Sequence, residues 1–399
     1  MRAAIKERKG FNIINVVIFL TAFLIFVFPN SFRSVKMPLL LLLFLVGITS
    51  VRHLNKFVFF SLISSFFITI TYLIIGLPSS AFPDEAMSQT LIVYIFTPLL
   101  WVVVLNYCFE RFYLNTIIKY LNIFMVLGCF SVFIAIWLFN NGQTKILELI
   151  IEDPNMTFSD KGIVEMKLFV YGSLIFFIPA FFQLESFYKV KWSYFIIILI
   201  TFLAAVVSGR SALLLSVFIG LSFYLFANPS LKIFKYILFG VILLTTSIFI
   251  LESFGVNILN IFEEFYKKIF EGGDKERPEQ TAALLNGINN HIFGAGHGVG
   301  VDYIRSYKFP WRYENVPFAL IYKVGIFGFI IYSLPFLYTV YAYLKLKNRK
   351  AIDHYMLIGL VSILIATFTN PYLESFEFNI FYVLPFVYFI KRDRILWEK

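Results

Sequence analysis

The chain has 399 residues, of which 59% are hydrophobic and only 15% charged. A soluble domain carries about a quarter charged residues, so this composition excludes an ordinary water-soluble fold and predicts an integral membrane protein. The net charge of +10 comes from short basic clusters between apolar runs. That pattern favours control of membrane topology and argues against nucleic acid as a partner.

Apolar runs of the length that a membrane helix needs recur along the whole chain. They lie at 12–29, 37–51, 57–77, 90–108, 116–139, 164–184, 191–207, 210–227, 231–251, 316–344, 352–369 and 376–390. We therefore predict an all-α polytopic membrane protein with about twelve transmembrane helices in one integral membrane domain, residues 1–399. The first run lacks a small-residue cleavage site, so we expect a retained anchor.

Charged residues in the connections predict the orientation of these helices. Basic clusters occur at 2–9, 52–56, 111, 189–191, 232–235, 345–350 and 391–394. Acidic residues dominate the intervening connections, and only Arg33 and Lys36 break the alternation. We therefore expect both termini in the cytoplasm and the acidic connections on the opposite side.

Two outer connections are long. The first, 140–163, contains the amphipathic stretch TKILELIIEDP, which could lie on the membrane surface. The second, 252–315, is expected between helices 9 and 10. It contains NILNIFEEFYKKIFEGG, which is typical of an amphipathic helix ended by Gly272 and Gly273.

Arg210, in the stretch SGRSALLL, sits between two apolar runs at the outer boundary. One interpretation is an arginine that snorkels to the membrane interface. The other is a contact to an anion, because a guanidinium forms bidentate hydrogen bonds to phosphate and a helix begins at this point.

The stretch GAGHGVGVDYIRSYKFPWRYENVP, 294–317, ends the second outer connection. Its glycines match neither a dinucleotide fingerprint nor a phosphate loop, so we expect tight turns and close approach of the backbone. His297 is a candidate acid, base or donor, or else a surface histidine. The basic residues alternate with aromatic ones, which suits a sugar phosphate or an interfacial belt. They are Arg305, Lys308 and Arg312, and Tyr303, Tyr307, Phe309, Trp311 and Tyr313.

Glu314 and Asn315 precede the apolar run that opens with Val316. A carboxylate at a membrane boundary can serve as a base, whereas Asn315 with Pro317 is also typical of a helix start. The chain has no HExxH, no CxxC pair and no Asp-rich motif, so we predict neither a metal site nor a cofactor.

Together these segments resemble the O-antigen polymerase and ligase superfamily of bacterial inner membranes. SGRSALLL is similar to the family's Ser/Gly-Arg-small-apolar signature, and NHIFGAGHGVG to its G-x-G-x-G segment in the large outer loop. ENVPFALIYKVGIFGFIIY is similar to its H-N-x-x-L…G-x-x-G entry into the next helix, with Asn315, Gly325 and Gly328 in matching places. Ligases of the superfamily have a histidine where this chain has Glu314, so the resemblance favours a polymerase.

The resemblance implies a GT-C-like, inverting, metal-independent glycosyltransferase of the inner membrane with its active site facing the periplasm. It would join undecaprenyl-pyrophosphate-linked oligosaccharides, with membrane lipid around it and a chain-length regulator and a flippase as partners. Glu314 or His297 would be the base or the group that orients the acceptor. Substrate would be bound by Arg210, Arg305, Arg312, Tyr307, Trp311, Tyr313 and Asn315. The alternatives are an O-antigen ligase that transfers the glycan to lipid A-core, and a lipid-linked oligosaccharide flippase.

Overall fold

The computed structural model describes residues 13–29, 31–50, 55–150, 156–158, 164–166, 172–184, 192–208, 211–227, 276–307 and 309–393, with a few single residues between 242 and 263. Within this part the regular secondary structure is helical apart from one antiparallel hairpin, β1 (Met156–Phe158) with β2 (Val164–Met166). β2 occupies the first three residues of the sixth predicted apolar run, 164–184, and the helix in that run begins at Gly172.

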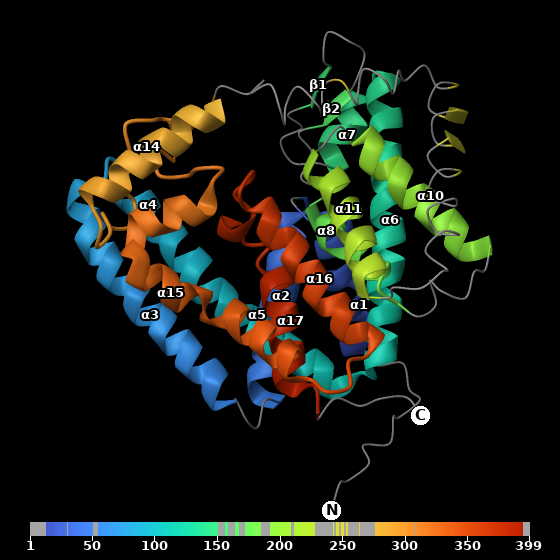
Figure 1. Ribbon diagram of the computed structural model, residues 1–399, viewed down its shortest axis with the longest axis horizontal. Helices are drawn as coiled ribbons and strands as arrows, with labels where there is room; N and C mark the ends of the chain where they lie inside the picture. Colours follow the sequence, from blue (N-terminus) through green and yellow to red (C-terminus); the bar gives the residue numbers. More distant parts are fainter. Residues whose placement is uncertain are drawn as a thin grey trace, which may run out of the picture.

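The helices alternate with short connections (Figure 1). They are α1 (Ile13–Val27), α2 (Arg33–Ser50), α3 (Lys56–Gly76), α4 (Pro83–Leu91), α5 (Thr97–Arg111), α6 (Leu114–Asn140), α7 (Thr144–Ile150), α8 (Gly172–Phe181), α10 (Trp192–Val207), α11 (Ser211–Ala227), α14 (Glu276–Asn290), α15 (Val316–Lys345), α16 (Ala351–Ala366) and α17 (Ile380–Lys391). A π-helical turn, η2 (Ile92–Phe96), joins α4 to α5, and a 3-10 turn, η4 (Tyr372–Glu374), precedes α17.

Four helical stretches are long and apolar enough to cross a membrane, at 56–79, 83–111, 114–139 and 316–345. Every predicted apolar run overlaps one of the helices, except 231–251, most of which lies outside the described residues. Large apolar side chains on α3 face outward, among them Phe60, Phe67 and Ile74. Such a surface fits contact with lipid tails. The expectation of a helical chain is therefore confirmed, and four of its helical stretches have the length and composition of membrane spans.

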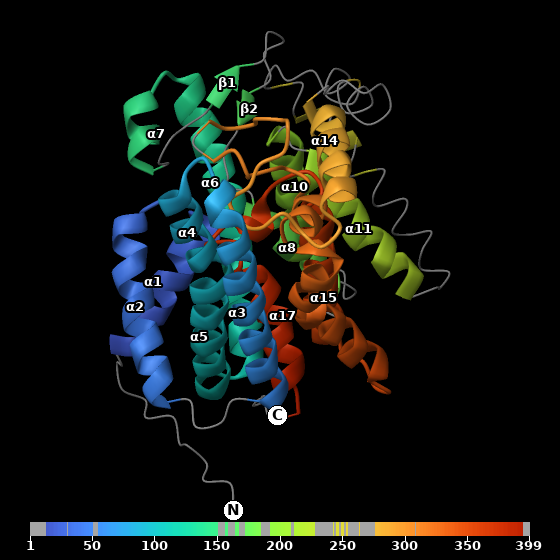
Figure 2. The ribbon, with the colours of Figure 1, turned by 90° about the vertical axis from the view of Figure 1, so that its left-hand side faces the viewer.

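Contacts between helix termini show which termini lie together at each end of the bundle. At one end, Arg111 of α5 donates to Asn15 of α1 over 2.7 Å, and Lys391 of α17 lies 2.5 Å from Glu110. We call this the basic end, because the connection 345–350 also lies there, held by Arg392 through the carbonyl of Asn348. The start of α1 and the end of α17 therefore lie at the same end of the bundle, at the bottom of Figure 2.

The opposite end, which we call the loop end, carries the segment 291–315 and the connection 367–379 (Figures 1 and 2). It also explains the two basic residues that break the charge alternation. Glu377 lies 3.6 Å from Arg33 and 4.0 Å from Lys36, and the Lys36 ammonium also donates to the carbonyl of Phe28. Both basic residues therefore lie beside one buried carboxylate at the loop end.

The two long outer connections contain regular structure. In 140–163, α7 covers most of the predicted amphipathic stretch. In 252–315, the predicted amphipathic helix at 257–273 lies outside the described residues, and α14 follows it. The sequence did not predict α14, because its residues are polar and lack an apolar stripe. It packs against the start of α15 around Leu284, Tyr313, Ala319 and Tyr322.

Candidate functional site

The glycine-rich segment docks onto a break in α15. Gly325 has φ 65° and ψ 175°, which interrupts the helix and frees carbonyl groups one turn earlier. Ala295 N donates to the carbonyl of Tyr322, and Gly296 N to that of Lys323, both over 2.8 Å. The next amide, that of His297, donates to the carbonyl of Tyr72 in α3 over 2.9 Å. The segment therefore ties α3 to α15 at the loop end.

Glycine is required where this segment touches the helices. Gly294, Gly296 and Gly298 all have positive φ, between 86° and 100°. A Cβ atom on Gly296 would lie 2.4 Å from the Cα atom of Gly76 in α3. The predicted tight turns and close backbone approach are confirmed.

His297 is buried, with 1% of its surface exposed. Its Nε2 atom lies 3.1 Å from the Tyr332 hydroxyl, and its ring lies 4.9 Å from that of Tyr94. Burial, with a smaller effect from the Lys323 ammonium, lowers the pKa of His297 to about 3. The imidazole is thus neutral near pH 7 and a weak base, which favours hydrogen bonding over proton abstraction. The interpretation as a surface histidine is wrong.

Lys323 of α15 and Glu374 of η4 form an ion pair whose side chains are both almost fully buried. The Tyr94 hydroxyl donates to the same carboxylate over 2.7 Å. Tyr94 also stacks on Tyr332 with 5.2 Å between ring centroids. We call Tyr94, His297, Lys323, Tyr332 and Glu374 the buried polar cluster.

The second carboxylate oxygen of Glu374 is buried and has no hydrogen-bond partner among the described residues. Burial alone would raise the pKa of Glu374, but the Lys323 ammonium, the hydrogen bond from Tyr94 and the charge of Arg312 together lower it. The carboxylate is therefore ionised and has an unused acceptor oxygen. Such an atom at the boundary of apolar helices can accept a hydrogen bond from a donor group of a ligand.

Glu314 lies between two arginines. One carboxylate oxygen is 2.9 Å from Arg277 of α14, and the other is 2.8 Å from Arg305. We call these three residues the glutamate–arginine bridge. All three side chains are partly exposed, so the bridge can exchange partners with a ligand. Arg305 and Glu314 were predicted as site residues from the sequence. Arg277 was not, because it lies outside the stretch 294–317.

Asn315 occupies the position before α15, and Pro317 lies in the first turn, as expected. The Asn315 side chain makes no capping hydrogen bond, however. Gln280 of α14 fixes the two residues before the helix, because its side-chain oxygen accepts from the amides of Glu314 and Asn315 over 2.8 and 3.2 Å. The Asn315 Oδ1 atom is buried and has no partner in the described part of the chain.

Two aromatic residues that the sequence assigned to sugar binding are packed inside. Trp311 is 3% exposed and donates to Gln89 of α4, while Tyr313 is fully buried and accepts from the amide of Val301. They hold the segment onto the helices, and the protein itself covers both rings in this structure. Tyr307, by contrast, is 84% exposed.

Arg312 acts electrostatically on the buried polar cluster. Its charge lowers the pKa of Glu374, and its Nε atom is buried without a hydrogen-bond partner among the described residues. Its guanidinium lies 5.6 Å from the ring centre of Phe309. Arg210 and Lys308 lie outside the described residues.

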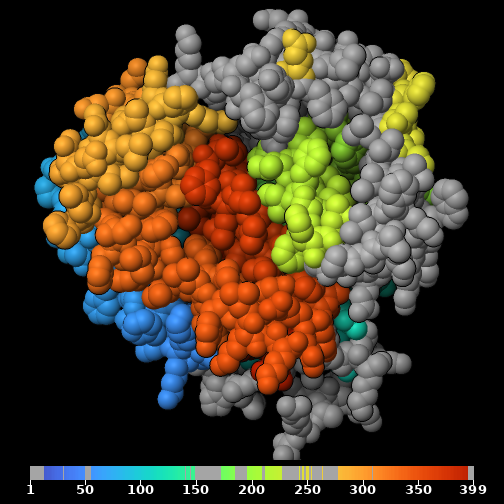
Figure 3. All heavy atoms as spheres, in the orientation of Figure 1, coloured from blue at the N-terminus to red at the C-terminus, as the bar shows by residue number. Residues whose placement is uncertain are grey.

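The arrangement concentrates positive charge and unused hydrogen-bonding atoms at the loop end. The positive groups are Arg277, Arg305, Arg312 and Lys323. The surface is hollowed next to this region, between α14 and α15 (orange) and the green-yellow helices before residue 227, with residues near the C-terminus (red) as its floor (Figure 3). An anionic group beside a lipid chain fits such a place.

Lys323 and Glu374 are not among the site residues predicted from the sequence. A lysine within a membrane helix is itself a signal of a functional or paired group, and its partner could have been sought among the loop-end carboxylates. Within the described residues, no group of three or more His, Cys, Asp or Glu side chains is placed to hold a metal ion. No family model, curated protein or solved structure matches this chain.

Proposed function

We propose that the chain is an O-antigen polymerase of the bacterial inner membrane. It would transfer a growing glycan from undecaprenyl pyrophosphate to an incoming lipid-linked repeat unit. The observation that carries the proposal is the glutamate–arginine bridge, with Arg312 and the buried polar cluster, at one end of a bundle of apolar helices. The order of the three sequence motifs supports it.

The proposed topology has about twelve transmembrane helices in a GT-C-like fold, both termini in the cytoplasm and the loop end in the periplasm. The lipid-linked substrate would then lie along the helices, with its pyrophosphate level with the loop end. A chain-length regulator and a flippase are proposed partners.

The reaction breaks the bond between the anomeric carbon of the donor glycan and the pyrophosphate oxygen. The leaving oxygen takes the electron pair, and arginines held in place stabilise that charge. Arg305, about one third exposed, can exchange Glu314 for a pyrophosphate oxygen. Arg210 is the second pyrophosphate contact that the family resemblance implies.

The exchange frees one oxygen of Glu314 to accept the proton of the attacking hydroxyl. A new bond then forms between the oxygen of the attacking hydroxyl and the anomeric carbon, on the face opposite the leaving group. The anomeric configuration inverts, and undecaprenyl pyrophosphate is released. Glu314 suits this role better than His297, whose lowered pKa makes it a weak base.

Deletion of the gene in its native host tests the proposal. The expected gel of surface glycan shows lipid A-core with a single repeat unit and no ladder, because export and ligation survive. A plasmid copy should restore the ladder, as should Lys347→Gln, an exposed basic-end control. Arg305→Gln should not. Bare core after deletion would contradict a polymerase and point to a ligase or a flippase.

A further inference from the structure

A pocket of about 870 Å³ lies at the basic end, away from the candidate site, and is bordered by α6, α8, α10 and α16. Most of its lining is apolar, including Val126 and Leu127 of α6, Phe181 of α8 and Ile197 of α10. A pocket of this size and composition can hold a segment of a hydrocarbon chain.

Two lysines give the rim of this pocket a positive charge. Lys119 lies in the second turn of α6, and Lys350 directly precedes α16. The described lining contains no aspartate or glutamate. The first turns of α6 and α16 both border the pocket as well, and their amide groups reinforce the attraction for an anion.

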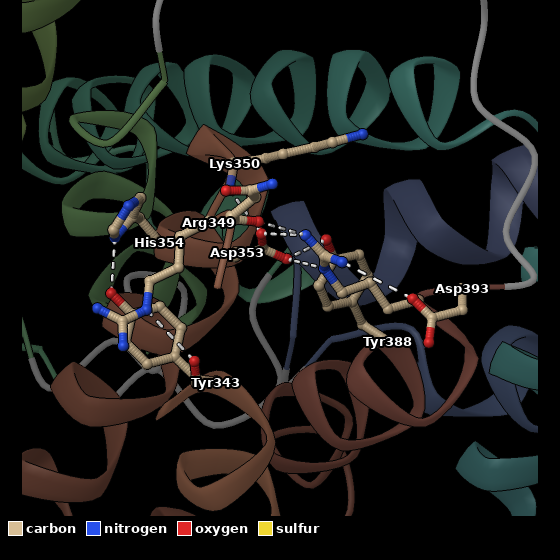
Figure 4. A network of polar contacts seen from close by, with 9 residues as sticks. Tyr343, Arg349, Lys350, Asp353, His354, Tyr388 and Asp393 are labelled. Carbon is tan, nitrogen blue, oxygen red and sulfur yellow. Dashed lines mark hydrogen bonds and ion pairs between the residues drawn. The ribbon is translucent and has the colours of Figure 1, made fainter. Parts of the chain in front are cut away.

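The neighbouring carboxylate belongs to Asp353, whose charge is matched by a guanidinium. Both its oxygens accept from Arg392, at 2.6 and 2.8 Å, and one also accepts from Tyr388. The backbone amide of Lys350 donates to Asp353 as well, and the Lys350 side chain extends away from that carboxylate (Figure 4). The nearby guanidinium of Arg349 lies 4.6 Å from the ring centre of Tyr343.

A third feature indicates a ligand with a hydrogen-bond donor. The Oδ1 atom of Asn122, another lining residue, is buried and has no hydrogen-bond partner in the part of the chain that the structure describes. Buried polar atoms of this kind are normally satisfied, and a hydroxyl group of a ligand would satisfy this one. Asn115, one turn earlier on α6, adds a further polar group at the exposed rim.

We propose that this pocket binds one anionic glycerophospholipid of the surrounding membrane. Its phosphate lies between Lys119 and Lys350, a headgroup hydroxyl donates to Asn122, and an acyl chain follows the apolar wall. Basic pockets between membrane helices recognise lipid headgroups through this combination of charge and depth. The proposal concerns a site separate from the candidate active site and does not depend on the proposed reaction.

Native mass spectrometry of the full-length protein in detergent tests the proposal, with dioleoyl phosphatidylglycerol as the probe and phosphatidylcholine as the neutral comparison. One phosphatidylglycerol should bind more tightly than the rest. Lys119→Gln with Lys350→Gln should weaken that binding about 30-fold, since each lysine near an anionic headgroup contributes a factor of about five. Lys345→Gln with Lys347→Gln, at the same end but outside the lining, is the matched control.

The proposal would be overturned if both double variants lost the same amount of phosphatidylglycerol binding. It would also be overturned if the protein retained phosphatidylcholine as well as phosphatidylglycerol. Glycerol 3-phosphate is the third probe. It should not displace the lipid at millimolar concentration, because it lacks the acyl chains, and displacement would show a site for soluble phosphate esters instead. Both variants change exposed side chains, so an unchanged melting temperature shows that the comparison is between folded proteins.

Discussion

The buried ion pair between Lys323 and Glu374 should contribute measurably to the free energy of unfolding. Both side chains are removed from solvent, with 2% and 3% of their surfaces exposed. Removing one partner leaves the other charge buried and unpaired, which costs about 3–5 kcal/mol. We therefore expect Lys323→Met and Glu374→Leu each to lower the free energy of unfolding by that amount.

The double variant should be far less damaged than the sum of the single variants. With both charges gone, neither group keeps an uncompensated charge, and replacing a buried pair by apolar side chains is often close to neutral. The Tyr94 hydroxyl would still lose its acceptor on Glu374, at a cost of about 1–2 kcal/mol. The predicted coupling between the two substitutions is therefore about 3 kcal/mol or more.

Equilibrium unfolding in mixed micelles of dodecyl maltoside and SDS measures all four proteins. Lys345→Met, an exposed lysine at the other end of α15, serves as the control and should change stability by less than about 0.5 kcal/mol. Additive effects of Lys323→Met and Glu374→Leu would refute the reasoning, because they would show that the two side chains do not compensate each other.

Three further predictions concern the loop end. Gly296→Ala should lower the unfolding free energy by more than about 2 kcal/mol, whereas Gly142→Ala, also at positive φ but with open space, should cost about 1 kcal/mol. Equal shifts in melting temperature would contradict the docking of the glycine segment. As pH falls from 6.5 towards 3, the free energy of unfolding should fall. The reason is that His297 binds a proton in the unfolded chain, whereas the buried imidazole of the folded protein stays neutral over this range. His297→Gln should remove up to about 1.4 kcal/mol per pH unit from that slope, and an unchanged slope in unfolding titrations would exclude the effect. Glu314→Gln should reduce polymer yield at least about 100-fold, as expected for a lost base, while changing unfolding free energy by only about 1 kcal/mol. Full yield would remove Glu314 from the reaction.

The helices follow from the sequence because lipid demands continuous apolar segments. The start of α15 is predictable for a local reason, since Asn315 and Pro317 carry its signals. The break at Gly325 is not predictable from the sequence, because a helix can either continue through a glycine or be interrupted by it. The docking of Ala295 and Gly296 on the freed carbonyls, which depends on the tertiary structure, satisfies the broken helix.

The candidate site was predictable only in part. Glu314 and Arg305 lie in one stretch, so their proximity is a local matter. Lys323 and Glu374 come together through the packing of separate elements, and no pattern in either stretch indicates the pairing. A tryptophan can stack on a sugar or fill a core, and the sequence does not distinguish the two. The burial of Trp311 is therefore seen only in the tertiary structure.

The most direct test of the central claim is a reaction with the purified chain in liposomes and a single undecaprenyl-pyrophosphate-linked repeat unit from its host. We expect a ladder of glycan lengths, with one undecaprenyl pyrophosphate released for each new linkage. With Glu314→Gln or Arg305→Gln we expect no ladder. A failure of the active-site variants to differ from the parent, or movement of intact substrate across the bilayer without any new linkage, would contradict it.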